Sequence, residues 1–271
     1  MNRIAEAFAR LKREGKGGFI PFITAGDPDI AATSELLVEL ANAGADVIEL
    51  GVPFSDPLAD GPTIQRASER ALKNGATLSR VIDLVRQIRD AKSPANEVPI
   101  VLFSYYNPLL QYGVDRLARE AKHAGVDGIL VTDLIPEEAE EFAATLKLNE
   151  LNMIFLVAPT STDDRLRKIS AYASGFVYAV SRTGVTGARE NLSDEAELLV
   201  ARMRKFCSLP VAVGFGISNA EQVQQTLTYA DAAVVGSAIV KRIEECAGRD
   251  SLVAEVGQFV RSLLPKAAKV A

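Results

Sequence analysis

Short apolar runs recur along the chain, and each is followed by a turn and by a stretch with helical spacing of its apolar residues. The runs are nearly continuous rather than alternating, which is typical of parallel strands covered on both faces. They predict eight strands, at residues 19–24, 46–50, 99–103, 128–132, 153–158, 176–180, 211–213 and 232–235. Eight strands that alternate with helices favour a closed α/β barrel over an open sheet. We therefore predict one domain over residues 1–271, a (β/α)8 TIM barrel preceded by an extra amphipathic helix.

Local capping signals predict where several helices begin. Asp27 and Pro28 suit an N-cap and the first helical position, and Pro136 followed by two glutamates suits another helix start. Residues 218–221 have the spacing of a capping box. A weak internal repeat, called the internal echo below, occurs at residues 43–48, 124–129 and 229–234. In each copy the end of a predicted helix is followed by a tight turn and by the start of a predicted strand. The echo supports a repeated strand–helix unit.

The longest gap between predicted strands follows the second strand. It holds a proline-rich loop and two predicted helices, at residues 63–73 and 78–91. Long ordered insertions commonly carry function or contact a partner. This insertion follows the carboxyl end of a strand, which is the face where the active sites of barrels lie.

Composition and charge exclude several classes of protein. The formal net charge is −5, and no cluster of lysine and arginine stands out, which opposes binding to nucleic acid or to an anionic membrane. No apolar run approaches the roughly 20 residues that span a bilayer. Cys207 and Cys246 are isolated, as expected of free thiols in a reducing cytosol, and the N-terminus resembles neither a signal peptide nor a transit peptide. We expect a cytoplasmic protein without a metal site.

The segment that runs from the end of the second predicted strand into the following loop carries three acidic residues. Glu49 ends an apolar strand, where it is either a solvated or salt-bridged strand end or a carboxyl whose pKa is raised by apolar walls. Asp60 lies in a stretch stiffened by prolines, and it either caps the following helix or has a role in a site. Asp56, which precedes a proline, could simply stabilise a turn.

Three turns near the C-terminus are rich in glycine, at residues 184–187, 214–216 and 236–237. Close packing at the rim of a barrel explains one such turn about as well as ligand binding does. Their order is more informative, because barrels bind phosphate groups with the loops after strands seven and eight and a helix N-terminus. The turn after strand seven has no lysine or arginine, so we expect backbone amides and Ser237 to bind the phosphate.

Several chemistries have no support in the chain. None of the eight runs contains the lysine that a Schiff-base aldolase needs. The single histidine, His123, lies in a helical stretch, where a surface or packing role is expected rather than a metal site. A dinucleotide fingerprint and a P-loop are absent. What remains is acid/base chemistry by carboxyl groups on a phosphorylated substrate.

The acidic loop resembles the tryptophan synthase alpha chain family. Its signature, an acid at a strand end followed by Gly-x-Pro-Phe-Ser-Asp-Pro-Leu-Ala-Asp-Gly-Pro, is present at residues 49–62, and further matches lie at residues 21–28, 105–108, 133–138, 181–187 and 214–218. The resemblance implies a lyase that cleaves indole-3-glycerol phosphate into indole and glyceraldehyde 3-phosphate. It assigns catalytic roles to Glu49, Asp60 and Tyr178, contacts with the substrate to Phe22, Tyr105, Thr186 and Phe215, and phosphate binding to Gly187, Gly216, Gly236 and Ser237.

The same resemblance implies a partner. The family acts with a pyridoxal-phosphate beta subunit in an alpha2beta2 complex, so this chain is expected to need no cofactor of its own. Residues 53–57 and 107–108 are the expected contacts, and residues 181–187 are expected to form a lid from which Thr186 reaches Asp60. Two other interpretations stay open. One is a different phosphate-binding barrel, an isomerase or a decarboxylase, and the other is a weakly active regulatory partner of a beta-type subunit.

Overall fold

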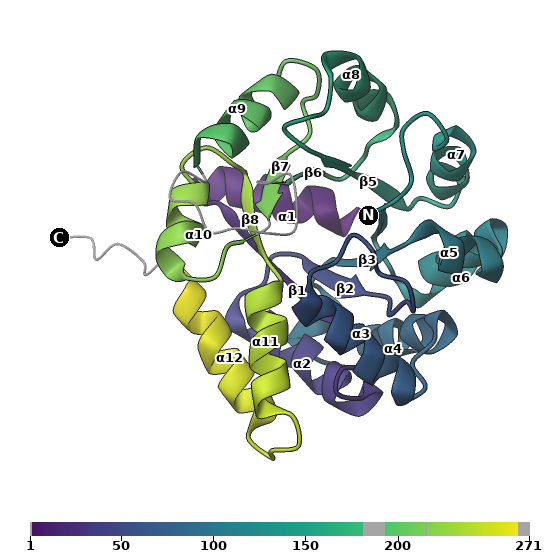
Figure 1. Cartoon of the computed structure of the whole chain (residues 1–271), viewed down its shortest axis with the longest axis vertical. Helices are drawn as coiled ribbons and strands as arrows, with labels where there is room; N and C mark the ends of the chain where they lie inside the picture. The colour runs from purple at the N-terminus through teal and green to yellow at the C-terminus, as the bar shows by residue number, and fades with distance from the viewer. Residues whose placement is uncertain (1, 181–192, 215, 265–271) are drawn as a thin grey trace.

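Eight parallel strands close into a barrel in chain order, with β1 paired to both β2 and β8. The computed structural model describes residues 2–180, 193–214 and 216–264, and Figure 1 shows the strands at the centre of a ring of helices. The strands are β1 (Gly18–Thr24), β2 (Ile48–Gly51), β3 (Ile100–Ser104), β4 (Gly128–Val131), β5 (Asn152–Val157), β6 (Val177–Val180), β7 (Val211–Gly214) and β8 (Ala232–Val235). Each overlaps a predicted strand, so the predicted (β/α)8 TIM barrel is confirmed.

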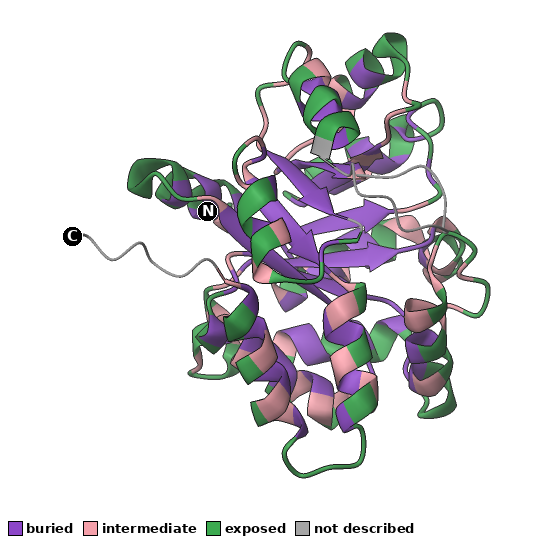
Figure 2. Cartoon of the chain, turned by 60° about the vertical axis from the view of Figure 1, so that its left-hand side comes forward, coloured by how far each residue is buried: buried purple, intermediate pink, exposed green. Residues whose placement is uncertain are grey.

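Helices cover the outside of the barrel, and the strands are buried beneath them (Figure 2). The described helices are α1 (Arg3–Glu14), α2 (Ile30–Ala43), α3 (Pro62–Lys73), α4 (Leu78–Asp90), η1 (Pro94–Asn96), α5 (Tyr106–Tyr112), α6 (Val114–Ala124), α7 (Glu140–Leu148), α8 (Asp163–Tyr172), α9 (Ser193–Met203), α10 (Ala220–Thr226), α11 (Ser237–Cys246) and α12 (Leu252–Leu263). Within the described ranges, each helix is too short or too polar to cross a membrane. Helices α3 and α4 are the predicted insertion after the second strand.

Helix α1 closes the amino end of the barrel. Its buried face places Ile4, Phe8 and Leu11 in the same apolar cluster as the residues inside the barrel. The ring of Phe8 packs against that of Phe176, with 5.8 Å between ring centroids. The extra N-terminal helix is therefore confirmed, and with this end of the barrel filled, a site for a ligand is left to the carboxyl end of the strands.

The internal echo corresponds to a repeated pair of hydrogen bonds at the amino ends of the strands. Before each even-numbered strand, one polar residue forms two hydrogen bonds with a single residue at or near the preceding strand. Its backbone N–H donates to the carbonyl of that partner, and its side-chain oxygen accepts the backbone N–H of the partner. The pairs are Asp46 with Phe19, Asp127 with Ile100, Ser174 with Met153 and Asp231 with Val211, at 2.8–2.9 Å. The echo detected at three positions thus has a fourth member that uses a serine hydroxyl.

One of the predicted helix starts is wrong because a neighbouring residue caps the helix instead. Helix α2 begins at Ile30, after Asp29, whose carboxylate accepts the N–H of Ala32 at 2.8 Å. The Asp27–Pro28 peptide is cis and precedes the helix. The carboxylate of Asp27 is bound by a side chain of α3 instead, a contact that a local capping rule does not consider.

Two other helix starts are displaced. Residues 136–138 form a turn in which the N–H of Glu138 bonds to the carbonyl of Ile135, and α7 begins only at Glu140. Before α10, Asn219 rather than Ser218 is the cap, because its side-chain oxygen accepts the N–H of Gln222 at 2.9 Å. Neighbouring polar residues compete for the same exposed helix amides, so capping signals locate a helix start only within a few residues.

Candidate active site

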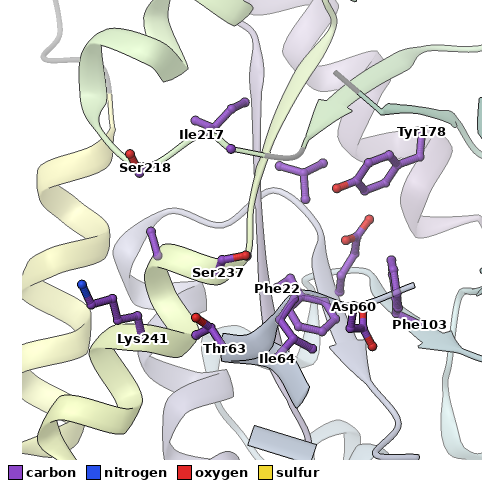
Figure 3. A pocket seen from close by; sticks show the side chains of 15 residues that line it. Phe22, Asp60, Thr63, Ile64, Phe103, Tyr178, Ile217, Ser218, Ser237 and Lys241 are labelled. Carbon is purple, nitrogen blue, oxygen red and sulfur yellow. The ribbon is translucent and has the colours of Figure 1, made fainter. Parts of the chain in front are cut away.

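A cavity of about 260 Å³ opens at the carboxyl end of the barrel strands (Figure 3). Strands β1, β2, β3, β6 and β8 form its floor, and the loop before α3, α3 itself and the N-terminus of α11 form its walls. The lining residues are Phe22, Glu49, Asp60, Thr63, Ile64, Phe103, Tyr178, Gly216, Ile217, Ser218, Val234, Gly236, Ser237, Ala238 and Lys241. Seven of the residues singled out from the sequence thus meet in one place, namely Phe22, Glu49, Asp60, Tyr178, Gly216, Gly236 and Ser237.

Glu49 faces the inside of the barrel because of the alternation along its strand. Ile48 and Leu50 pack in the outer cluster against the helices, whereas Val47 lies in the inner cluster, so Glu49 points inward. Its exposed fraction is 1%, and neither carboxyl oxygen has a hydrogen-bond partner among the described residues. Burial raises the pKa of Glu49 to about 8. The interpretation of Glu49 as a solvated or salt-bridged strand end is therefore wrong.

Aromatic side chains surround this carboxyl. Phe22 pairs with Glu49 in the β1–β2 register, and its ring packs edge-on against that of Phe103 at 5.2 Å. Tyr178 is buried as well, and Figure 3 shows Phe22 and Phe103 next to Asp60, with Tyr178 farther up in the view. Burial, and then the negative charge of Glu49, raise the pKa of Tyr178 well above its ordinary value. The phenol therefore remains protonated beside the carboxyl and is available as a hydrogen-bond donor.

Asp60, the second carboxyl of the cavity, is bound by Tyr105. The hydroxyl of Tyr105 donates to Oδ2 of Asp60 at 3.1 Å and accepts the N–H of Ala59 at 2.9 Å. Burial raises the pKa of Asp60 to about 6, and the hydrogen bond from Tyr105 opposes this shift. Tyr105 does not itself line the cavity. Its ring packs against Phe54 at 5.3 Å, so it contacts the site through Asp60.

Helix α3 holds the backbone of the acidic loop. The side chain of Gln65 donates to the carbonyl of Asp60 at 2.9 Å and, more weakly, to that of Pro57 at 3.5 Å. Gly61 is the N-cap of α3, and the cap has no side-chain hydrogen bond. The interpretation of Asp60 as a helix cap is therefore wrong, because its carboxylate bonds to Tyr105 and not to the amides of α3.

The far end of the cavity is polar and has glycine in its backbone. Gly236 precedes α11, and Ser237 begins it, so the first amides of this helix lie at the cavity wall. Gly216 adopts a φ of 88°, a left-handed conformation that suits glycine. Amides at a helix N-terminus next to glycine turns form a ready site for an anion such as phosphate.

The sequence did not single out six of the lining side chains that come from helices and loops, namely Thr63, Ile64, Ile217, Ser218, Ala238 and Lys241. Spacing could have indicated Lys241, since it lies four residues after Ser237 on the same helix and hence on the same face. Lys241 borders the cavity, although 67% of its side chain is exposed. Its ammonium lies 3.9 Å from Oε1 of Glu245. This end of the cavity thus has a positive charge nearby, which the glycine turn alone does not indicate.

Three predicted site residues lie outside the described part of the chain. They are Thr186, Gly187 and Phe215. The expected lid at residues 181–187 lies there as well. The roles predicted for these residues stay predictions.

A parallel barrel with its cavity at the carboxyl ends of the strands, walled by the loop after β2 and the helix after β8, defines a ligand-binding (β/α)8 barrel of the enzyme type. Comparison with known proteins identifies the family. Residues 8–268 match the family model described as tryptophan synthase alpha chain. The chain belongs to this family, which functions in tryptophan biosynthesis.

Individual relatives agree along almost the full length of the chain. The tryptophan synthase alpha chain of Geobacter sulfurreducens is 52% identical over 97% of this chain and 98% of that protein. The crystal structure of tryptophan synthase subunit alpha from Legionella pneumophila superposes with a TM-score of 0.89 at 36% identity, covering 97% of both chains. A chain of tryptophan synthase from Mycobacterium tuberculosis in its aminoacrylate-bound form gives a TM-score of 0.84 at 36% identity, covering 97% of this chain and 100% of that one.

Proposed function

We propose that this protein cleaves indole-3-glycerol phosphate into indole and glyceraldehyde 3-phosphate. The observation that carries the proposal is Glu49, a fully buried carboxyl without a hydrogen-bond partner in the described structure, whose pKa is raised to about 8 at the floor of the cavity. A carboxyl with such a pKa exchanges protons near neutral pH, which is what an acid/base catalyst requires. The family and the apolar cavity support the choice of an indole substrate.

The proposed reaction uses the indole ring as its own electron sink. Glu49 donates a proton to ring carbon C3, which gives an indolenine cation. The resulting carboxylate then removes the proton of the side-chain hydroxyl, the C–C bond breaks, and its electrons return to the ring as the aldehyde forms. Asp60 accepts the hydrogen bond of the ring N–H and stabilises the positive charge that develops there. Tyr178 is the polar neighbour of Glu49 in this scheme.

The remaining contacts follow the shape of the cavity. The indole ring lies against the paired rings of Phe22 and Phe103, in the half of the cavity that holds both carboxyls. The phosphate lies at the other half, where Gly216, Gly236 and Ser237 present amides. Gly187, Thr186 and Phe215 complete the proposed site. This chemistry needs no cofactor in this chain.

We also propose that the carboxyl face of the barrel binds a tryptophan synthase beta subunit, which holds pyridoxal phosphate and receives the indole. Apolar side chains on loops and a helix of this face support the proposal. Leu58 is 87% exposed, Leu110 is 50% exposed and Ile135 is 39% exposed. Exposed apolar side chains that gather into one patch commonly mark an interface. Leu58 directly follows the expected contact segment at residues 53–57, Leu110 lies two residues after the one at 107–108, and Ile135 lies on the loop after β4. An alpha2beta2 complex is the assembly we expect.

Measuring indole release from indole-3-glycerol phosphate, with and without a beta chain, tests the proposal. We expect indole from the wild type and turnover reduced by about 10²–10⁴ in Glu49→Gln, since a catalytic proton donor is removed. The variant should still bind substrate analogues. Substrate consumed without release of indole would favour the isomerase or decarboxylase, and stimulation of the beta chain without cleavage would favour the regulatory partner. Turnover close to that of the wild type in Glu49→Gln contradicts the role of Glu49.

A second pair of variants tests Asp60. Asparagine still accepts a hydrogen bond from the ring N–H but carries no charge, whereas alanine does neither. We expect Asp60→Asn to retain more activity than Asp60→Ala. Equal loss in the two variants contradicts the proposed contact with the ring N–H.

A further inference from the structure

Four charged residues form a network beside the cavity, and none of them lines it. Arg70 of α3 binds the carboxylate of Asp27 with two hydrogen bonds of 2.8 and 2.9 Å, and its remaining terminal nitrogen donates to Glu244 of α11 at 2.7 Å. Arg66, one turn earlier on α3, binds both oxygens of Glu244 at 2.8 and 2.7 Å. We call Asp27, Arg66, Arg70 and Glu244 the α3–α11 network.

Three of the four side chains of the network are less exposed than those of an ordinary surface ion pair, while that of Arg66 is 49% exposed. The side chain of Asp27 is 1% exposed, and those of Arg70 and Glu244 are 25% and 27% exposed. Burial raises the pKa of Asp27, and the paired hydrogen bonds from Arg70 oppose that shift. The two arginines lower the pKa of Glu244 to about 2, so it remains charged near neutral pH. Paired, charge-assisted hydrogen bonds set a defined geometry between the elements that they join.

The elements joined by the network are the two walls of the cavity. Helix α3 begins just after Asp60 and contributes Thr63 and Ile64 to the lining, while α11 begins with Ser237 at the phosphate end. Helices α3 and α11 lie side by side (Figure 1) and pack against each other and against β1. Asp27 follows β1, the strand between β2 and β8, so the network spans the distance from one wall to the other.

Both packing and charge contacts join the elements around the network. A Cβ atom on Gly26 would come within 2.6 Å of the Cβ of Ala76, so the loop that carries Asp27 is pressed against the segment after α3. Among the described residues, Glu244 forms its ion pairs with Arg66 and Arg70 of α3. These contacts therefore add a defined charged link to the packing of α11 against α3 and β1.

We infer that the α3–α11 network determines the length of substrate that the site accepts, by holding the Asp60 end and the Ser237 end of the cavity at a fixed separation. The inference rests on the proposed function, because it assumes an aromatic ring at one end and a phosphate at the other. Its members are positioning residues, since none of them reaches the ligand. Binding sites discriminate tail length only when their two ends are held rigidly.

A series of indol-3-yl alkyl phosphates tests the inference. Compounds with two, three and four carbons between ring and phosphate are titrated calorimetrically into the wild type, Glu244→Gln and Arg70→Lys. We expect the wild type to favour the three-carbon tail, which matches indole-3-glycerol phosphate, by about tenfold or more over each neighbour. In both variants the preference should narrow to about threefold or less, mainly through weaker binding of the three-carbon compound.

A matched control separates positioning from general stability. Glu255 of α12 forms an ion pair of 2.7 Å with Arg242 of α11, and its side chain is 27% exposed, as is that of Glu244. Unlike α11, helix α12 does not line the cavity. Glu255→Gln should lower the melting temperature about as much as Glu244→Gln while leaving the tail-length preference unchanged. If Arg70→Lys unfolds, because it leaves Asp27 buried with a poorer partner, Glu244→Gln still decides the matter, since Glu244 is partly exposed.

The outcomes separate this inference from the proposed function. Wild-type protein that binds the three-carbon compound, with the same preference in Glu244→Gln, overturns the inference and leaves the proposed function intact. Wild-type protein that binds none of the compounds overturns both. A preference lost in Glu255→Gln to the same degree as in Glu244→Gln also overturns the inference, because any loosened helix would then suffice.

Discussion

The backbone of Gly214 lies directly against the hydroxyl of Tyr178. A Cβ atom at position 214 would come within 2.0 Å of the phenolic oxygen and 2.6 Å of the adjacent ring carbon. Tyr178 pairs with Ala212 in the β6–β7 register. Its side chain extends along the inside of the barrel toward Gly214, the next residue of β7 that faces inward after Ala212. The end of strand β7 thus requires a residue without a side chain, and this leaves Tyr178 room beside Glu49.

Replacing Gly214 with alanine should displace Tyr178 from the cavity. We expect turnover to fall by about 10²-fold, because small shifts of groups at a reacting centre cost this much. Crowding should also lower stability by about 1–3 kcal/mol. Steady-state cleavage of indole-3-glycerol phosphate and thermal unfolding measure the two effects.

Gly18→Ala is the matched control for this variant. A Cβ atom there would meet Leu11 at 2.9 Å, at the amino end of the barrel and far from the cavity. It should lower the melting temperature and leave turnover nearly unchanged. Wild-type turnover in Gly214→Ala would show that the position of Tyr178 does not matter for the reaction.

The two carboxyls of the cavity should give a bell-shaped pH profile of kcat/KM. The proposed mechanism needs Asp60 charged, and its pKa is raised to about 6, so activity should fall as the pH drops below this value. It needs Glu49 protonated for the first step, and its pKa is raised to about 8, so activity should fall as the pH rises above that value. The maximum is expected between the two.

The substrate phosphate also titrates near pH 6, so the acidic limb needs a control. In Asp60→Asn the acidic limb should disappear if Asp60 causes it and should persist if the phosphate does. A profile of the wild type that is flat from pH 7 to about 9 would argue against protonated Glu49 as the reactive form.

Glu49 should make the protein less stable as the pH rises. Its folded pKa of about 8 lies above its ordinary value of 4.5, so the folded state holds a proton that the unfolded state has lost between these values. Stability is therefore highest below about pH 4.5 as far as this group is concerned, and it falls until about pH 8. Each pKa unit corresponds to about 1.4 kcal/mol, so the total effect is on the order of several kcal/mol.

Glu49→Gln should remove this dependence. Denaturant unfolding at a series of pH values should show the variant gaining stability relative to the wild type between about pH 5 and pH 8, with a constant difference above. Glu141→Gln, at an exposed position of α7, serves as the control and should keep the slope of the wild type. Parallel curves for Glu49→Gln and the wild type would mean that Glu49 is hydrated and not buried.

Tyr105→Phe should shift the acidic limb of the pH profile. The hydroxyl of Tyr105 donates to Asp60, and this bond opposes the rise in the pKa of Asp60 that burial causes. Without it, the pKa of Asp60 should move above about 6, so activity at pH 6 should fall more than activity at pH 7.5. Tyr106→Phe is a suitable control, because the ring of Tyr106 packs against that of Phe142 on α7. An equal loss at both pH values in Tyr105→Phe would indicate a packing effect only.

Several features of the candidate site followed directly from short segments of sequence. The inward position of Glu49 follows from alternation along one strand, and the placement of Gly236 and Ser237 follows from the known geometry of strand eight and its helix. Helix starts were less accurate, as Asp27, Pro136 and Ser218 show, because neighbouring polar side chains compete for the same amides. Tyr105 was assigned to the cavity lining, whereas its hydroxyl holds Asp60 from behind.

By itself, the sequence determined the number of strands, their order, and the acidic and glycine-rich loops at their carboxyl ends. These features depend on the periodicity and the turn residues of segments of about ten positions. Such local patterns do not depend on how distant segments pack. Only the tertiary structure decided that Glu49 has no partner in the described structure, that Tyr178 fits over Gly214, and that Arg66 meets Glu244 across 178 positions. Such contacts form when the barrel closes and brings distant strands and helices together, so no local pattern encodes them.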